Sequence, residues 1–243
     1  MDEALYRAFA EIEDRHWWFV ARRRIVQDVI EHDLQLFPGA SILDIGCGTG
    51  GMLASLSGRY DVVGTDMSPL AIEHCCRRGL KKVHCGTLAD LPFRDRPFDL
   101  ALLLDVIEHV DDDAALLREA GDLVKPGGAV IVTVPAYPWM WTHHDEANHH
   151  RRRYTATTFR SSLTRAGFRI RSLSSYNTIL FPLALVQRLA AGFLHSTSVA
   201  GLSVPPAPVN AILRMLFASE RFFLRFLRFP FGLSLIAVVE RPA

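Results

Sequence analysis

Cysteine is scarce in this chain, and its four cysteines follow no metal-binding spacing. Cys75 and Cys76 are adjacent, whereas Cys47 and Cys85 each stand alone, so the sequence contains no CxxC pair. This pattern argues against a zinc site and against a disulfide framework. We therefore predict no metal ion, and a reducing cytoplasm is the expected location.

An excess of charge of either sign is also missing. The chain has 27 Lys and Arg residues against 26 Asp and Glu residues, for a formal net charge of +1. No long-range field therefore attracts nucleic acid, and we expect no nucleic-acid partner. The arginine runs at 22–24 and 151–153 are predicted to form solvated faces or structural ion pairs.

Long uninterrupted apolar runs are lacking too. A membrane-spanning helix needs about 20 consecutive apolar residues. The best candidate, Thr178 to Leu194, is interrupted by Pro182 and Arg188, so we predict that it does not span a membrane. Residues 1–4 are acidic and precede no apolar core, which predicts that there is no signal peptide.

The chain does show a repeated alternation of strand and helix patterns. Strands are predicted at 41–45, 61–65, 82–85, 98–104, 129–134, 168–174 and 233–240. Helices are predicted at 3–34 with a break near His16, and at 52–56, 69–78, 112–123 and 157–166. This order predicts an open, mostly parallel sheet with helices on both sides.

A glycine-rich loop follows the strand expected at 41–45. Gly46, Gly48 and Gly50 carry no Cβ, so the backbone of this strand-to-helix turn can approach a ligand closely. Gly51 also completes the GxGxxG fingerprint of dinucleotide sites. The loop alone therefore fits two cofactors, a nicotinamide dinucleotide and S-adenosylmethionine (SAM).

Of two aspartates near this loop, one favours SAM over the dinucleotide. Asp66 ends the next strand and is placed to accept hydrogen bonds from ribose hydroxyls, which suits both cofactors. Asp44 lies two residues before the first glycine, where a pyrophosphate gives it no role. It suits the ammonium group at the methionine end of SAM, and a helix or turn cap is the alternative role for this residue.

The segment 42–50, Ile-Leu-Asp-Ile-Gly-Cys-Gly-Thr-Gly, resembles motif I of the class I SAM-dependent methyltransferases. Further matching segments follow in order at 63–68, 91–93, 98–99, 105–110 and 123–128. The resemblance implies an α/β fold with a seven-stranded, mostly parallel Rossmann-like sheet, and S-adenosyl-L-methionine as cofactor. A nicotinamide-dependent oxidoreductase, the rival interpretation, has no use for Asp44 or for segment 105–110.

The resemblance also assigns cofactor contacts by position. Asp105, at the end of the central strand, is expected near the methyl-bearing sulfur. Segment 86–92 resembles the adenine loop, in which relatives usually have an acidic residue after the glycine. This chain has Thr87 there, so either Thr87 or Asp90 accepts the adenine amino group, with Leu88 between them. The remaining cofactor contacts are assigned to Asp44, Gly46, Cys47, Gly48, Gly50, Asp66 and Met67.

A polar, histidine-rich loop at 135–154 follows a predicted strand, at the edge where open sheets place their ligands. Methyl transfer is an in-line displacement, so the enzyme aligns the nucleophile and removes its proton. His143, His144 and Asp145 are the first candidates for a general base with an orienting carboxylate, and His109 is the next. A metal site and a merely polar loop are the alternatives, as is simple packing for His109.

An aromatic cluster at 16–19 precedes the arginines at 22–24. N-terminal helices of class I enzymes commonly close over SAM, so Trp18 is expected to contact the sulfonium by cation–π attraction. A hydrophobic staple that holds the helix on the sheet is the alternative. With the histidine-rich loop, this cluster resembles a group of bacterial class I enzymes from cell-envelope or secondary-metabolite pathways.

A long segment separates the last two predicted strands, far more than an ordinary connection. A helix over Asn210–Phe229 is expected to lie on an anionic bilayer through its basic, aromatic surface, or to form a lid over a greasy acceptor with Ile179–Leu194. A helical cap or a dimer interface is the alternative. The arginines predicted to share one face of this helix are Arg214, Arg221, Arg225 and Arg228.

We predict a single methyltransferase domain over residues 1–243. It comprises a helical cap at 1–38, a SAM-binding core at 39–175, a helical insertion at 176–230 and the last strand at 231–243. The expected activity is methyl transfer to an oxygen or nitrogen of a small or lipid-linked acceptor, by a cytoplasmic monomer or homodimer with peripheral membrane contact. A SAM-binding enzyme or regulator that does not methylate is the alternative.

Overall fold

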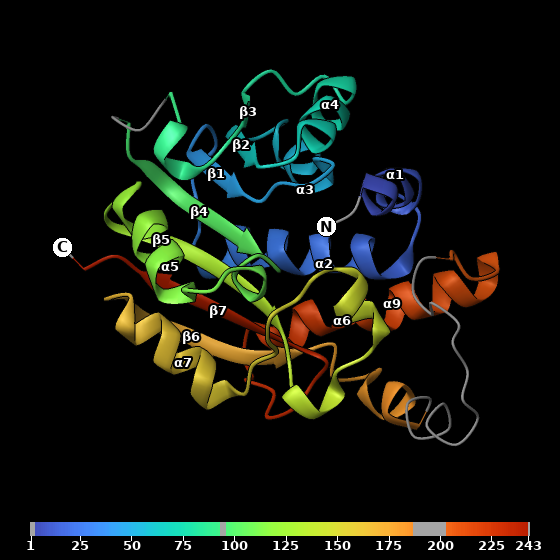
Figure 1. Cartoon of the computed structure of the whole chain (residues 1–243). Coiled ribbons are helices and arrows are strands. Elements are labelled where there is room, and N and C mark those ends of the chain that lie inside the picture. Colours follow the sequence, from blue (N-terminus) through green and yellow to red (C-terminus); the bar gives the residue numbers. More distant parts are fainter. Residues whose placement is uncertain (1–2, 93–95, 187–202, 243) are drawn as a thin grey trace.

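The structure is a computed structural model that describes residues 3–92, 96–186 and 203–242. Its centre is a seven-stranded sheet in the order β3-β2-β1-β4-β5-β7-β6 (Figure 1). Only β7 runs antiparallel to its neighbours, so the predicted mostly parallel seven-stranded sheet is confirmed. The strands are β1 (Ser41–Ile45), β2 (Asp61–Asp66), β3 (Val83–Cys85), β4 (Phe98–Leu104), β5 (Val124–Pro135), β6 (Arg169–Tyr176) and β7 (Ser234–Glu240).

The chain order reverses between β1 and β4, because β2 and β3 extend the sheet on one side of β1 and β4 begins the other side. Open sheets bind ligands at the carboxyl ends of their strands beside such a switch point. The glycine loop follows β1 and Asp105 follows β4, so both lie at this point. The fold therefore positions the predicted cofactor residues together.

The α-helices are α1 (Glu3–Ile12), α2 (Trp17–Asp28), α3 (Gly51–Leu56), α4 (Pro69–Arg77), α5 (Asp113–Asp122), α6 (His143–Ala147), α7 (Ala156–Arg165) and α9 (Ala207–Leu224). Residues 181–186 are also helical. A π-helical turn, η1 (Val29–Asp33), follows α2, and the 3-10 turns are η2 (Leu88–Asp90), η3 (Ile107–His109) and η4 (Pro138–Met140). Among the described residues, no helix combines the length and the apolar character needed to cross a bilayer.

Alternating strand residues build two hydrophobic layers. Leu43 and Leu103 face α5 and α7 in one layer, whereas Ile42 and Leu102 face α2 and α9 in the other. Each layer buries large apolar side chains, which is the dominant stabilising term for such a sheet. Helices α2 and α9 lie side by side, although α2 lies in the first part of the chain and α9 in the last (Figure 1).

Local signals explain the breaks between helices. The break predicted near His16 is confirmed, because the His16 side chain accepts a hydrogen bond from the Trp18 amide at 3.3 Å and caps α2. Ser68 caps α4 in the same way, and Pro69 occupies its first turn. The predicted helix to residue 34 ends instead in the π-helical turn η1.

Two predicted boundaries differ from the structure by five residues. Strand β5 begins at Val124 rather than Ala129, because Val124 pairs with Phe98 across an irregular register. Helix α9 ends at Leu224 rather than Phe229, since the Phe229 carbonyl accepts a hydrogen bond from the Ser175 amide at 3.1 Å. The chain thus leaves the helix to pair with β6. The apolar stretch predicted to reach Leu194 lies outside the described residues from 187 onward.

Arg225 and Arg228 therefore lie beyond the last residue of α9, and not within a helix as predicted. Arg225 caps its end and donates to the Asp28 carboxylate on α2, with one contact of 2.8 Å. Arg228 lies 4.0 Å from the Asp33 carboxylate. Of the four predicted arginines, Arg214 and Arg221 lie within α9.

Candidate active site

The glycine loop makes a tight turn at the carboxyl end of β1. The amides of Gly46 and Cys47 both donate to the Thr65 carbonyl, at 2.8 and 3.0 Å. Gly46 has φ +70°, and a Cβ there would lie 2.7 Å from Val106 Cγ2. Gly48 has φ +55°, but a Cβ there would meet no atom within 4 Å. Gly46 is thus required by packing, whereas Gly48 borders open space.

Asp66 connects this loop to β2. Its carboxylate accepts hydrogen bonds from the amides of Gly48 and Ser68, each at 2.9 Å, and from the Tyr6 hydroxyl at 3.2 Å. Burial and the Asp66 carboxylate raise the pKa of Tyr6, so that hydroxyl keeps its proton and remains a donor. The residue predicted for the ribose is therefore fixed in position beside the glycine loop.

The N-terminal helices are attached to this loop by an ion-pair network. The Glu13 carboxylate accepts a hydrogen bond from the Thr49 hydroxyl and pairs with Arg78 at 3.0 Å. The neighbouring Asp14 pairs with Arg78 at 2.7 Å and with Arg23 at 2.9 Å. The connection between α1 and α2 is therefore held against the cofactor loop.

Asp44 and Asp105 form the acidic centre of the site. Asp44 is 2% exposed, and burial raises its pKa to about 7 against the opposing charge of Arg22. Asp105 has φ +59°, accepts from the Thr133 hydroxyl at 3.1 Å and forms an ion pair with Arg22. The Arg22 guanidinium lies 4.7 Å from the Trp18 ring centroid. The predicted sulfonium partner Trp18 thus makes its cation–π contact with Arg22 here.

The predicted adenine segment forms a turn after β3. Thr87 donates to the Asp90 carboxylate from both its amide and its hydroxyl, at 3.1 and 2.7 Å. These bonds lower the pKa of Asp90, and both residues are exposed. Leu88 is buried in the core, whereas Met67 is 76% exposed. The two candidate acceptors for the adenine amino group therefore contact each other.

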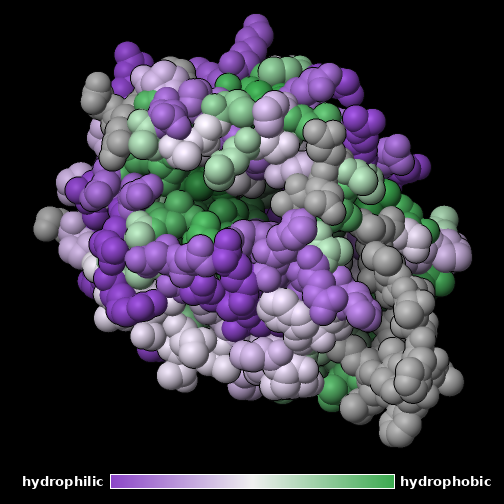
Figure 2. Space-filling model, in the orientation of Figure 1, coloured by the Kyte–Doolittle hydropathy of each residue, from purple (hydrophilic) through white to green (hydrophobic). Residues whose placement is uncertain are grey.

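Cys47, within the glycine loop, contacts Cys75 on α4. Its Sγ lies 3.9 Å from Cys75 Sγ, and both cysteines are buried. The Cys75 thiol contacts the Gly48 carbonyl at 3.3 Å. Figure 2 shows a hollow near the centre of the view, with hydrophobic residues along its floor and hydrophilic residues below it.

The histidine-rich loop divides into an exposed part and a buried part. His143 is exposed, and its Nδ1 lies 2.9 Å from the Glu146 carboxylate in a surface pair. The side chain of His144 lies outside the described part of the structure. Asp145 is fully buried and contacts His150 Nδ1 at 2.9 Å and Arg153 Nε at 2.7 Å. Burial opposes its ionisation, but these donors hold the pKa of Asp145 well below its usual range.

His150 is the residue that sequence reasoning missed. Its ring centroid lies 4.7 Å from that of His109, and ligand atoms of Glu108, His109 and His150 lie within 4.8 Å of one another. Glu108 is fully buried without a hydrogen bond to either carboxylate oxygen, and burial and Asp105 raise its pKa. Burial and His150 lower the pKa of His109 to about 4. Each of these three side chains offers one ligand atom, and together the three atoms could hold a metal ion.

The arginines at 151–153 attach the histidine-rich loop to η3. Arg151 Nε donates to the His109 carbonyl at 3.0 Å, and Arg152 donates to the Val110 carbonyl at 2.8 Å. Arg153 contacts the Ala136 carbonyl at 3.0 Å in addition to Asp145. The prediction that this run makes structural contacts is confirmed.

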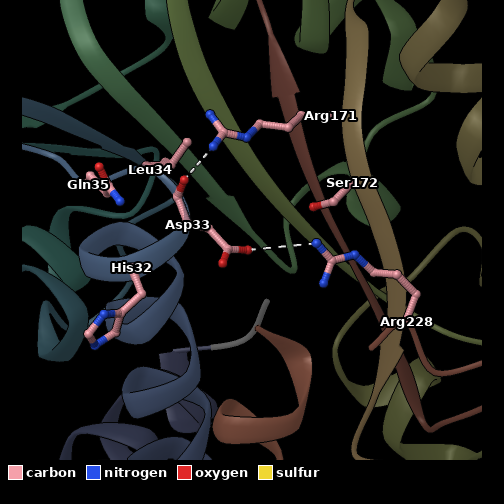
Figure 3. Close-up of a pocket in the computed structure, with 7 residues that line it drawn as sticks. All are labelled: His32, Asp33, Leu34, Gln35, Arg171, Ser172 and Arg228. Atoms are coloured by element: carbon pink, nitrogen blue, oxygen red, sulfur yellow. Dashed lines mark hydrogen bonds and ion pairs between the residues drawn. The ribbon is translucent and has the colours of Figure 1, made fainter. Parts of the chain in front are cut away.

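A separate polar pocket of about 390 Å³ lies at the opposite edge of the sheet. It is lined by η1, the first half of β6 and Arg228 (Figure 3). Arg171 and Arg228 point toward Asp33, and Arg228 lies 4.0 Å from its carboxylate. None of the predicted site residues lines this pocket, so it is not the candidate active site.

Comparison with known proteins identifies the family. The sequence model of a methyltransferase domain matches residues 18–173, which is well over half of the chain. The chain belongs to this methyltransferase family. The matched span includes the glycine loop, Asp66, Asp105 and the pair Asp145–His150.

Similarity to individual proteins agrees with this assignment. A ubiquinone biosynthesis O-methyltransferase of Azorhizobium caulinodans is 38% identical over 126 residues, which are 46% of this chain and 49% of that protein. The chain thus matches about half the length of its curated relatives. Structural similarity extends further along the chain.

A putative methyltransferase from Haloferax volcanii, solved with the activator Trm112, superposes with a TM-score of 0.63 at 20% identity. That match covers 99% of this chain and 96% of the other. The N-methyltransferase NodS of Bradyrhizobium japonicum, solved with S-adenosylhomocysteine, superposes with a TM-score of 0.53 at 13% identity, over 91% and 87% of the two chains. At these identities, the likeness shows the shared fold.

Proposed function

We propose that this protein uses SAM to methylate an oxygen or nitrogen of a small-molecule acceptor. The observation that carries the proposal is the Asp66 carboxylate, which the Gly48 and Ser68 amides hold beside an open glycine turn. Membership of the methyltransferase family supports the same activity. The relative from Azorhizobium caulinodans is named as an O-methyltransferase, which supports an oxygen acceptor.

The acidic residues of the site would each contact a different part of the cofactor. A carboxylate offers about four lone-pair sites, so Asp66 can accept ribose hydroxyls in addition to its amide partners. Buried Asp44 would ionise to pair with the ammonium group of SAM, because an opposite charge favours the carboxylate form. Asp105 would face the sulfonium, and Thr87 and Asp90 the adenine.

We assign the general base to His150, with Asp145 as its positioning residue. A carboxylate that accepts the Nδ1 proton leaves the basic lone pair of a neutral imidazole on Nε2. Bound SAM would supply the methyl group, its carbon–sulfur bond breaking as the acceptor oxygen bonds to the methyl carbon, and His150 would take up the acceptor proton. Burial and His150 lower the pKa of His109 to about 4, which makes His109 a poor proton acceptor at physiological pH.

The acceptor proposed for this site is apolar or lipid-linked. An aromatic row follows β5, in which the Tyr137 ring lies 5.4 Å from Trp139 and 5.8 Å from Phe181. Phe231 continues the row at 5.6 Å from Phe181. Trp139 is 62% exposed, which suits contact with an apolar molecule rather than a structural role.

Equilibrium binding of SAM to the purified protein tests the cofactor. Micromolar binding of SAM without binding of NAD supports the proposal, and binding of NAD alone would overturn it. Formation of S-adenosylhomocysteine with a panel of phenols, catechols and amines, short and alkylated, then tests the reaction. SAM binding without any turnover across the panel would favour a non-methylating SAM-binding protein.

A further inference from the structure

Helix α9 has two apolar faces of different character. One face is buried against α2, where Phe217 lies 5.9 Å from the Trp17 ring. The other face is exposed, and its side chains recur at the spacing of one helix side. Phe226, just beyond the helix, is 84% exposed, and Met215 is 63% exposed. The exposed face consists of Ile212, Met215, Phe222, Phe223 and Phe226.

A row of positive charge borders this exposed face. The Arg221 guanidinium lies 4.5 Å from the Phe222 ring, and that of Arg225 lies 5.6 Å from it. Burial and the charges of Arg214 and Arg221 lower the pKa of Arg24 on α2, so these three arginines lie close together. Over the described residues, neither Arg214 nor Arg221 forms an ion pair. Arg214 and Arg221 therefore keep their charge available to an anionic partner, whereas Arg225 pairs with Asp28.

The same charges argue against a second copy of this chain as the partner. A symmetric contact brings identical patches together, so it would oppose arginine with arginine. The only acidic residue of α9 is Glu220, which is fully buried and accepts a hydrogen bond from the Ile179 amide at 2.7 Å. The face thus offers no carboxylate to neutralise the arginines of a partner.

We propose that α9 binds to the surface of an anionic lipid bilayer. The exposed Met and Phe side chains would enter the boundary between headgroups and acyl chains, and Arg214 and Arg221 would contact lipid phosphates. Because α9 packs on α2, which also carries Trp18 and Arg22, the bilayer would lie beside the helices that cover the active site. The proposal does not depend on the reaction catalysed.

Co-sedimentation of the full chain with vesicles tests this proposal. The probes are vesicles of phosphatidylcholine alone and of equal parts phosphatidylcholine and phosphatidylglycerol, at low and high salt. Binding to the anionic vesicles that weakens at high salt is expected, because salt screens exposed charges. Lack of binding to the anionic vesicles at low salt would overturn the proposal.

Two α9 variants and two matched controls locate the contact. Met215→Ser with Phe226→Ser, and Arg214→Gln with Arg221→Gln, should each weaken vesicle binding by about tenfold or more. The controls are Phe37→Ser, on the segment before β1, and Arg160→Gln, on α7 across the sheet; both should bind as the unaltered chain does.

Other outcomes exclude the assignment to α9. Vesicle binding unchanged in both α9 variants would contradict it. A lipid-free dimer that dissociates on Met215→Ser with Phe226→Ser would instead assign the face to a second copy. Thermal unfolding and SAM binding of each variant verify folding, and the arginine variant remains a test if the apolar variant does not fold. Failure of the unaltered chain to bind SAM would contradict the proposed function, but it would not contradict the proposal that α9 binds a bilayer.

Discussion

The cofactor side and the acceptor side of the site are built differently. On the cofactor side, neighbouring strand ends supply partners directly, as when the Gly48 amide donates to Asp66. On the acceptor side, Asp145, His150 and His109 meet because the Arg151 amide donates to the Glu108 carbonyl at 2.8 Å across the chain. The first arrangement is local to a motif, whereas the second depends on tertiary packing. Substitutions on the cofactor side should therefore change SAM binding, and those on the acceptor side should change the rate of the reaction.

The largest effect is expected at His150. We predict that His150→Gln lowers kcat by about 10²–10⁴-fold, the range for loss of a general base, with the affinity for SAM unchanged. Steady-state kinetics and calorimetric SAM binding measure the two quantities. His143→Ala is the matched control and should change kcat less than about twofold, since His143 is an exposed surface residue. Equal losses in the two variants would contradict the assignment of His150.

A smaller loss, confined to binding, is expected at Asp66. Hydrogen bonds to charged groups contribute about 1.5–3 kcal/mol, so Asp66→Asn should weaken SAM binding by about tenfold or more. Calorimetry measures this affinity, and denaturant unfolding separates it from any change in stability. An unchanged affinity would remove Asp66 from the ribose contact.

A pH dependence is expected from Asp44. Its folded pKa is about 7, above its usual value of 3.8, so in the free protein it is mostly protonated below pH 7. SAM should bind about tenfold more weakly at pH 6 than at pH 8, because binding to the ammonium group requires ionised Asp44. Asp44→Asn should abolish this difference, and a persisting difference would assign it to another group.

The same pKa predicts an effect on the stability of the SAM-free protein. A carboxyl group whose pKa is higher in the folded than in the unfolded protein favours folding while it is protonated. Its contribution to the free energy of unfolding is complete below the pKa of the unfolded protein, and it is lost as the pH rises through the folded pKa of about 7. The melting temperature of Asp44→Asn should therefore rise relative to the unaltered chain between pH 5 and pH 8. A difference in melting temperature that does not vary with pH would contradict the raised pKa.

The smallest effect is a difference between two glycines of one loop. Gly46→Ala and Gly48→Ala both place a side chain at positive φ, but only the first also meets Val106. Overpacking costs about 1–3 kcal/mol, so Gly46→Ala should lower the free energy of unfolding further by about 1 kcal/mol. Denaturant unfolding measures the difference, and equal stabilities would show that Val106 moves aside freely.

Prediction from sequence succeeded where patterns are local. The strand Ser41–Ile45 and the loop after it have the predicted extent, because apolar runs and glycine spacing specify them directly. The predicted end of α9 is wrong, because no local sequence pattern shows that Phe229 pairs with Ser175 instead of continuing the helix.

The acceptor side shows the same limit of prediction. Asp145 was among the predicted residues, but its partner His150 was not. That pair depends on a turn in which His149 has φ +55° and the His150 amide donates to the Asp145 carbonyl at 2.9 Å. A left-handed histidine is not signalled by composition or periodicity. Arg225 likewise pairs with Asp28, a residue 197 positions away that no local pattern indicates.

The hydrogen bond from Tyr6 to Asp66 has a kinetic consequence. If the ribose displaces the Tyr6 hydroxyl from this carboxylate, each turnover breaks and remakes the contact, and we expect movement of Tyr6 on α1 to accompany cofactor exchange. Such motions commonly limit turnover in enzymes that cover their ligands. Stopped-flow release of S-adenosylhomocysteine should therefore be faster for Tyr6→Phe, and an unchanged release rate would show that the helix does not control the exit.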